Sequence, residues 1–300
     1  MPGVKGCVKR TFPCLIALLL SLCLPLSATA EAVQLDGRYY EIFLPAYPSG
    51  APLILALHGG GGNPDQFATA SGFGRAATRA GYAVVFAAGS GRRGDKLLTW
   101  NAGYCCGYAV RKGIDDTAFL VQLIADASER FSVDGEKVYL TGMSNGSMMS
   151  EAFAARKPDK VRAVAGVAGT VDTSVYSVGG KVPALIIHGT ADTMVPYDGG
   201  KGDQSLTRVG FASAASVVAA FLDPWGGGVT KATTQIDRWQ DGTSVKVTNY
   251  RQDGAVVLRL MTVNGGAHHW PGGSKARQTT GKTREIDANT EILRFFALYP

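Results

Sequence analysis

Charged residues are scarce in this sequence of 300 amino acids. Asp, Glu, Lys and Arg together make up 18% of the residues, and apolar side chains make up 46%. This composition excludes the disordered class and allows a full hydrophobic core, with one domain as the simplest organisation. The net charge is +6, and +3 once the three basic residues among residues 1–30 are left out. That charge is too mild to indicate nucleic acid or an acidic polymer as a partner.

The apolar run over residues 14–26 is too short to be a membrane span. It falls below the ~20 apolar residues of a spanning helix, and Pro25 interrupts it. Basic residues precede the run and the small residues 27–30 follow it, which is the pattern of a secretory signal peptide. The sequence therefore predicts a signal peptide over 1–30, export to the periplasm or the extracellular space, and no stable membrane association after cleavage.

Cysteine is rare as well. Three of the five cysteines lie in the signal peptide, and lipid attachment at one of them, Cys23, is a minor alternative because bulky Leu22 precedes it. The single domain expected over 31–300 keeps only the adjacent Cys105 and Cys106, which make no disulfide framework. A bond between these neighbours is predicted. Two free thiols are the alternative, because Cα atoms about 3.8 Å apart are closer than disulfides usually require.

The pattern of apolar residues indicates an α/β fold. Helices are expected over 115–130, from 145 onward and near 211, and a hairpin over 233–250. Short apolar runs typical of buried strands occur at 38–44, 52–57, 82–87, 138–141, 161–167, 182–188 and 256–263. Because strands and helices alternate, the sequence predicts a mostly parallel central sheet with helices on both faces.

Ser144 has the surroundings of a nucleophile. It is the serine of a Gly-x-Ser-x-Gly motif, between an apolar strand and a helical run. Such a serine occupies a tight turn in which flanking side chains would collide, which explains Gly142 and Gly146. The helix that follows supplies a favourable dipole for negative charge.

A nucleophilic serine needs a base and an acid, and in this fold they follow it in the order acid, then histidine. Of the four histidines only His268 and His269 come late enough after an acid to serve as the base. Asp192, directly after an apolar strand, is the acid candidate, with an Asx-turn as the alternative use of its carboxylate. Neither histidine stands at metal-ligand spacing with a cysteine pair, so no zinc site is expected.

A glycine-rich loop supplies the remaining part of an esterase site. His58 and four glycines follow an apolar strand, and the backbone N–H of Gly60 is a candidate oxyanion donor. The second candidate donor is the N–H of Asn145. No Lys-Ser/Thr follows the glycines, which excludes a phosphate-binding Walker loop.

The motifs together resemble the esterase family of extracellular polyhydroxybutyrate depolymerases, feruloyl esterases and acetyl xylan esterases. The resemblance implies an α/β-hydrolase fold, a triad of Ser144, Asp192 and His268, and no cofactor. Ser147 departs from the family pattern, because glycine is usual there. The segments that carry the resemblance are 57–62, 100–101 with 105–106, 114–120, 139–146, 188–192 with 195–196, and 265–272.

The function expected from these residues is secreted hydrolysis of carboxylic esters through an acyl-enzyme. Feruloyl or acetyl esters of plant polysaccharide are the leading substrates, and a hydroxyalkanoate polyester such as polyhydroxybutyrate, or its oligomers, is the alternative. A secreted binding protein that has kept the fold without the activity is the alternative from a different class. A peptidase is a weaker interpretation, because no large extra domain restricts access to the site.

Overall fold

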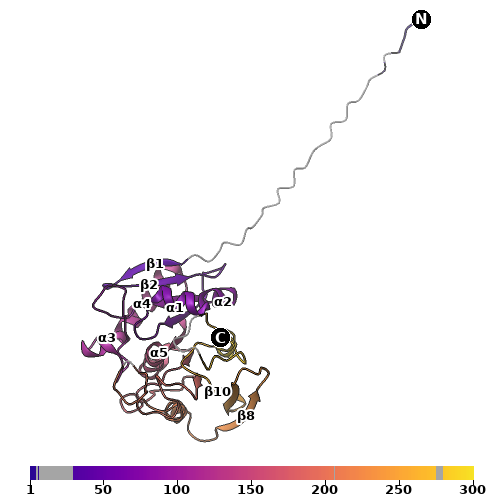
Figure 1. Cartoon of the computed structure of the whole chain (residues 1–300). Coiled ribbons are helices and arrows are strands. Elements are labelled where there is room, and N and C mark those ends of the chain that lie inside the picture. Colours follow the sequence, from indigo (N-terminus) through magenta and orange to yellow (C-terminus); the bar gives the residue numbers. More distant parts are fainter. Residues whose placement is uncertain (5, 7–29, 206, 275–279) are drawn as a thin grey trace.

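The computed structural model describes residues 1–300 except 5, 7–29, 206 and 275–279 (Figure 1). Most of the expected signal peptide therefore lies outside the described residues. Within them, no helix has the length and the apolar character that crossing a membrane requires.

The described residues form one ten-stranded sheet in the order β1-β2-β4-β3-β5-β6-β7-β10-β9-β8. Figure 1 shows β1 and β2 at one end of the molecule and β8 at the other. The strands are β1 (Glu31–Leu35), β2 (Arg38–Phe43), β3 (Pro52–Leu57), β4 (Ala83–Ala87), β5 (Asp134–Met143), β6 (Ala163–Val167), β7 (Ala184–Gly189), β8 (Thr230–Ile236), β9 (Ser244–Gln252) and β10 (Ala255–Asn264).

The centre of the sheet is parallel and its two edges are antiparallel. Strands β4, β3, β5, β6, β7 and β10 pair in parallel, whereas β1, β2, β8 and β9 pair antiparallel to their neighbours. The mostly parallel sheet predicted from the sequence is confirmed. In open sheets of this kind ligands bind beyond the carboxyl ends of the parallel strands, so the loops after β3, β5, β7 and β10 are the places to examine.

Helices cover both faces of the sheet. The helices are α1 (Pro64–Ser71), α2 (Phe73–Arg79), α3 (Gly107–Arg111), α4 (Asp116–Phe131), α5 (Asn145–Arg156), α6 (Ala214–Leu222) and α7 (Ala288–Phe296). Leu53, Leu55 and Leu57 of β3 pack in the core with α4, α5 and α6. The alternate residues Ile54 and Ala56 pack in a second core with α1, α2 and α7. This alternation is what a strand buried on both faces requires.

The bounds of several elements differ from those expected. The helix expected near residue 211 begins at Ala214, because the side chain of Ser213 accepts a hydrogen bond from the N–H of Ser216 and caps it. Strand β5 begins at Asp134, four residues earlier than the apolar run indicates, because its first residues are only partly buried and polar. The hairpin is formed by β8 and β9.

Candidate active site

Ser144 lies on a sharp turn between β5 and α5. Its backbone has φ +56° and ψ −124°, a conformation that side-chain-bearing residues rarely adopt. The N–H of Ser144 donates to the carbonyl of Val167 at 2.8 Å, and its own carbonyl accepts from Met148 N–H at 3.0 Å. The serine thus sits where β5 ends, beside the end of β6 and at the N-terminus of a twelve-residue helix.

The two glycines of the motif are required by close backbone contacts. A Cβ on Gly142 would lie 2.5 Å from the carbonyl carbon of Gly146, and a Cβ on Gly146 would lie 2.0 Å from the carbonyl oxygen of Leu57. Both distances are far inside van der Waals contact. Strand β3, the serine turn and the start of α5 therefore pack too closely for any residue other than glycine.

Asp192 and His268 form a hydrogen-bonded pair. Asp192 follows β7 and His268 follows β10, and these strands are neighbours in the sheet. The Nδ1 atom of His268 lies 2.7 Å from Oδ2 of Asp192, and both side chains are buried. The donor in this bond is the imidazole N–H, because an ionised carboxylate can only accept.

The carboxylate of Asp192 also forms the Asx-turn that the sequence offered as the alternative. Its Oδ1 accepts the N–H groups of Met194 and Val195, each at 2.9 Å. One oxygen therefore fixes the loop while the other holds His268. The Asx-turn is confirmed, and it leaves the second oxygen free to accept from His268, because a carboxylate has enough acceptor sites for both contacts.

A second histidine lies against the same carboxylate. The Nε2 atom of His188 is 2.8 Å from the carbonyl oxygen of Val195 and 3.4 Å from Oδ2 of Asp192. Burial alone would raise the pKa of Asp192, but hydrogen bonds from His188 and His268 and their charge interactions outweigh it and lower that pKa. Asp192 is therefore held as the anion.

The neighbouring His269 points elsewhere. Its Nε2 atom lies 2.7 Å from the carbonyl oxygen of Thr280, to which it donates. Of the adjacent pair, only His268 contacts Asp192 among the described residues. This is the separation expected of neighbouring side chains on an extended segment.

The glycine-rich loop after β3 is held in place by His58. Burial lowers the pKa of His58 to about 4, and the hydrogen bond to the Gly59 carbonyl opposes this shift only in part. The ring is therefore neutral. Its Nδ1 lies 2.8 Å from the Gly59 carbonyl oxygen, and its Nε2 accepts from Gly89 N–H at 3.0 Å. A Cβ on Gly60 would lie 3.6 Å from Cβ of Asn145. The two candidate oxyanion donors thus lie next to each other.

The contact between Asn145 and Trp100 was not predicted from the sequence. Oδ1 of Asn145 accepts from the N–H of Trp100 at 2.7 Å, and its Nδ2 donates to the Trp100 carbonyl at 3.1 Å. The indole N–H of Trp100 donates to the His58 carbonyl at 3.0 Å. Trp100 therefore joins the serine turn to the glycine-rich loop, which explains why this residue belongs to the motif.

Cys105 and Cys106 are joined by a disulfide bond on the loop that follows Trp100. Their Cα atoms are 3.0 Å apart because the peptide bond between them is cis, closer than the 3.8 Å expected for a trans bond. The Cys106 N–H donates to the Trp100 carbonyl at 2.8 Å. The disulfide and Asn145 are therefore both hydrogen-bonded to the backbone of Trp100.

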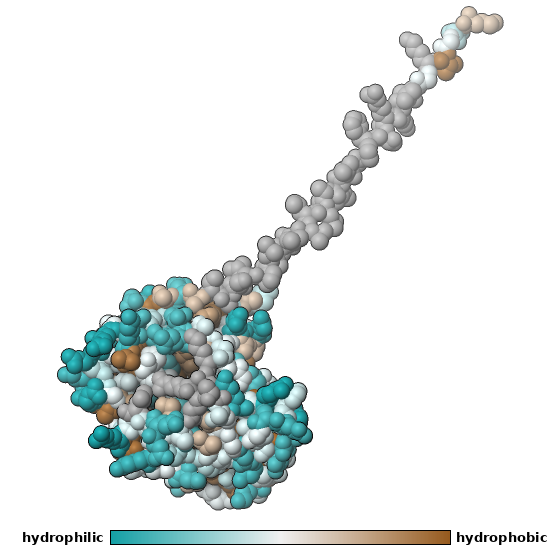
Figure 2. Space-filling model, viewed as in Figure 1, coloured by the Kyte–Doolittle hydropathy of each residue, from teal (hydrophilic) through white to brown (hydrophobic). Residues whose placement is uncertain are grey.

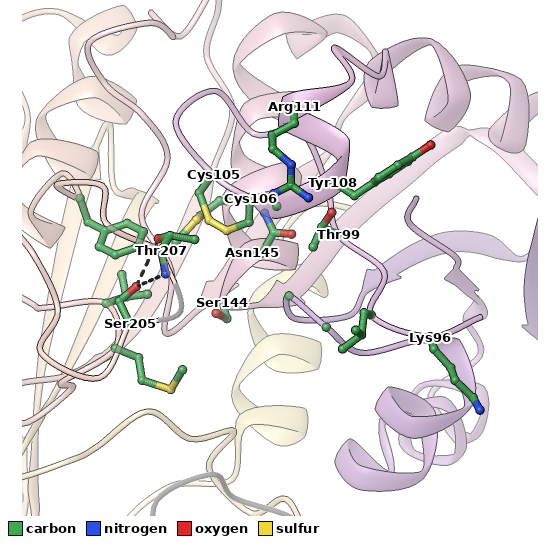
Figure 3. A pocket seen from close by; sticks show the side chains of 18 of the residues that line it. Lys96, Thr99, Cys105, Cys106, Tyr108, Arg111, Ser144, Asn145, Ser205 and Thr207 are labelled. Carbon is green, nitrogen blue, oxygen red and sulfur yellow. Dashed lines mark hydrogen bonds between the residues drawn. A yellow bond between two sulfur atoms is a disulfide. The ribbon is translucent and has the colours of Figure 1, made fainter. Parts of the chain in front are cut away.

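A cavity of about 610 Å³ opens over Ser144 (Figure 3). Its size falls in the range of small-molecule sites. Gly60 and Asn145 line it together with both cysteines and with Met194, which follows Asp192 by two residues. The nucleophile candidate, both oxyanion candidates and the disulfide therefore face one space.

Glu151 is a buried acid that the sequence did not reveal. It lies on α5 with an exposed fraction of 1%, and burial raises its pKa to about 8 although hydrogen bonds oppose this. Ser147 Oγ lies 3.1 Å from one carboxyl oxygen, and the N–H of Val171 donates to the other at 2.7 Å. A Cβ on Gly166 would lie 2.1 Å from Oε1 of Glu151. Ser147, which stands where the family usually has glycine, therefore contacts the buried carboxyl group of Glu151. Gly166 of β6 leaves the space that this group occupies.

Comparison with solved structures agrees with this architecture. An acetyl xylan esterase from Aspergillus awamori superposes with a TM-score of 0.58 at 13% identity, covering 90% of this chain and 99% of its own. Esterase PE8 superposes with a TM-score of 0.55 at 16% identity, over 86% of this chain and 97% of its own. At such identities the likeness establishes the α/β-hydrolase fold alone.

Sequence comparison identifies the family. "Putative esterase NocK" of Nocardia uniformis subsp. tsuyamanensis is 32% identical over 271 residues, covering 83% of this chain and 75% of NocK. Feruloyl esterase B of Piromyces equi is 28% identical over 74% of this chain but only 41% of its own length. The family model described as esterase PHB depolymerase matches residues 39–181. The chain is an esterase and belongs to the PHB depolymerase esterase family.

Proposed function

We propose that this esterase is a secreted serine hydrolase in which Ser144, Asp192 and His268 form the catalytic triad. Gly60 and Asn145 are the proposed oxyanion donors. The observation that carries the proposal is the hydrogen bond between Asp192 and His268, at the carboxyl edge of the sheet where Ser144 occupies its strained turn. Strained serine turns of this kind present the hydroxyl to a bound ester.

The proposed reaction gives each of these groups a role in acylation. Because Nδ1–H of His268 is engaged by Asp192, its Nε2 is the atom that takes the proton from Ser144 Oγ. The serine oxygen attacks the ester carbonyl while the two backbone N–H groups stabilise the oxyanion. His268 then donates its proton to the leaving alcohol, and water releases the acid from the acyl-enzyme by the same route.

The proposed substrates are feruloyl or acetyl esters of plant polysaccharide. Relatives named as feruloyl esterases and acetylxylan esterases support this choice. Met148, Met194 and Phe211 give the cavity an apolar surface suited to an acyl group. Polyhydroxybutyrate or its oligomers are the alternative substrates, which the name of the matching family supports.

Secretion is supported by the composition of residues 1–30, and residues 31–300 form the proposed catalytic domain. Mass spectrometry of the exported protein is expected to find Glu31 as its first residue. Recovery of the exported protein with residues 1–30 still attached would contradict this part of the proposal.

A substrate panel tests the catalytic part. Wild-type protein and the Ser144→Ala variant are assayed on feruloyl, acetyl-xylan and hydroxybutyrate esters. We expect the wild type to hydrolyse at least one of them and the variant none, with the same melting temperature, because the substitution removes one hydroxyl from a residue that lines the cavity and belongs to neither hydrophobic core. Hydrolysis by the variant at the wild-type rate would refute the role of Ser144.

A further inference from the structure

Four basic side chains line the cavity over Ser144. Arg92, Arg93 and Lys96 belong to the loop after β4, and Arg111 is the last residue of α3. The cavity lining among the described residues includes no aspartate or glutamate. We call these four residues the cationic wall. Such a concentration of one sign of charge is unexpected in a protein whose net charge outside residues 1–30 is only +3.

Two members of the cationic wall can be placed relative to Ser144. Figure 3 shows Arg111 and Lys96 on one side of Ser144, and Ser205 and Thr207 on the other, with the guanidinium of Arg111 directed toward Asn145. In Figure 2, hydrophilic side chains gather on the side of the molecule where Figure 1 shows α3. A ligand at Ser144 would therefore have the positive charge of Arg111 and Lys96 on the side opposite Ser205 and Thr207.

The four residues of the cationic wall form no ion pair within 4 Å in the described part of the protein. The nearest acids in sequence are Asp95 and Asp115. Asp95 lies in the same loop but does not line the cavity, and the Asp115 carboxylate caps α4 by accepting the N–H of Ala118 at 2.9 Å.

We propose that the cationic wall binds a carboxylate of the substrate, so that the preferred substrate is an ester carrying a carboxylate besides the ester that is cleaved. The inference rests on the proposed function, because it takes Ser144 as the point of attack. A cavity of about 610 Å³ can hold both the ester at Ser144 and an anionic group at Arg111. Arginine is suited to this task, since its planar guanidinium forms two parallel hydrogen bonds with a carboxylate.

Two sources can supply this chemistry. A linear hydroxyacid oligomer carries a carboxylate at its free end, and an acidic polysaccharide carries uronic acids near its acyl groups. A neutral feruloylated or acetylated sugar carries none. The cationic wall therefore favours the acidic members of both proposed substrate classes over their neutral members.

The test compares matched esters on matched variants. The substrates are the half ester of adipic acid with 4-nitrophenol and its primary-amide analogue, which differ only in charge. The variants are Arg111→Gln and Lys112→Gln, which remove the same charge from adjacent exposed residues, of which only Arg111 lines the cavity. The measured quantity is the ratio of kcat/KM for the anionic ester to that for the amide.

We expect this ratio to be about ten or more in the wild type, to fall about tenfold in Arg111→Gln and to stay unchanged in Lys112→Gln, in line with the strength of charge-assisted hydrogen bonds. Raising the salt concentration to about 0.5 M should lower the wild-type ratio, because the four basic residues are exposed to solvent. A wild-type ratio of one or less, or equal ratios in the wild type and in Arg111→Gln, would overturn the inference.

Further substrate pairs identify the source of the carboxylate. The same assays distinguish failure of the cationic-wall inference from failure of the proposed function. A hydroxybutyrate dimer is compared with its amide, and an acetylated xylo-oligosaccharide with its glucuronic-acid-bearing counterpart. The pair with the larger anionic preference identifies the source. If the amide is hydrolysed as fast as the anionic ester, only the cationic-wall inference fails. If neither ester is hydrolysed faster by the wild type than by Ser144→Ala, the proposed function itself fails.

Discussion

Replacing Asp192 with Asn should abolish turnover while leaving the fold intact. In the wild type Oδ1 accepts two backbone N–H groups and Oδ2 accepts the N–H of His268. An amide nitrogen cannot accept, so the new side chain must keep its oxygen on the N–H groups of Met194 and Val195. Its NH₂ group then faces Nδ1 of His268.

This orientation reverses the tautomer of His268. Its Nδ1 would have to accept from the amide, which places the proton on Nε2, the atom that must take the proton of Ser144. The expected loss in kcat is about 10⁴-fold, the loss found when the acid of a serine triad is made an amide. This loss corresponds to roughly 5 kcal/mol of transition-state stabilisation.

The control is Asp192→Ala, which removes the acceptor for both backbone N–H groups as well. It should lose activity and also roughly 2–5 kcal/mol of stability, because two buried donors lose a charged acceptor. Steady-state kinetics on 4-nitrophenyl butyrate and urea unfolding measure the two quantities. The reasoning is refuted if Asp192→Asn keeps more than about a tenth of the wild-type kcat, because a reversed tautomer allows no such rate.

Three further predictions concern neighbouring groups. His268→Ala should lower kcat at least about a thousandfold and His269→Ala far less, since the ring of His269 donates to a backbone carbonyl away from the acid; equal losses in steady-state assays would disprove the assignment. Because the pKa of Glu151 is raised to about 8, the native state binds more protons than the unfolded state between pH 4.5 and 8, so stability should fall as pH rises through this window. Urea unfolding should show this fall, at most roughly 5 kcal/mol, and Glu151→Gln should flatten it; an unchanged slope in the variant would contradict the cause. Thiol titration of the denatured, unreduced protein should find neither Cys105 nor Cys106 free, and two free thiols would refute the disulfide.

The central architecture could be predicted from the sequence because its signals are local. Apolar runs of strand length define the parallel strands, and the strand-turn-helix context of Ser144 is contained in a short segment. The edges of the sheet were harder to predict. Edge strand β1 was not predicted, and only residues 233–236 of β8 fall within the predicted hairpin, since the exposed residues of β8 give no apolar pattern.

The contacts that hold the site together could not be predicted, because they join distant segments. Asn145 and Trp100 are 45 residues apart, yet the side-chain amide of Asn145 forms hydrogen bonds with both the backbone N–H and the carbonyl of Trp100. Glu151 has the sequence context of a solvent-facing glutamate on a helix, yet α5 is buried almost all round. Two residues could have indicated the burial of Glu151, namely Ser147 in place of the usual glycine and Gly166 in β6. Their role is clear only from the structure, where both lie next to the carboxyl group of Glu151.

We propose above that Ser144 is a nucleophile activated by His268. The most direct test of this proposal is labelling of the purified protein with a fluorophosphonate, followed by peptide mass spectrometry to locate the modified residue. We expect one phosphonylated site, at Ser144, with labelling abolished in Ser144→Ala and slowed at least about a thousandfold in His268→Ala, because a serine without its base is not nucleophilic. Failure of the wild type to react, or equal labelling of the wild type and Ser144→Ala, would contradict it.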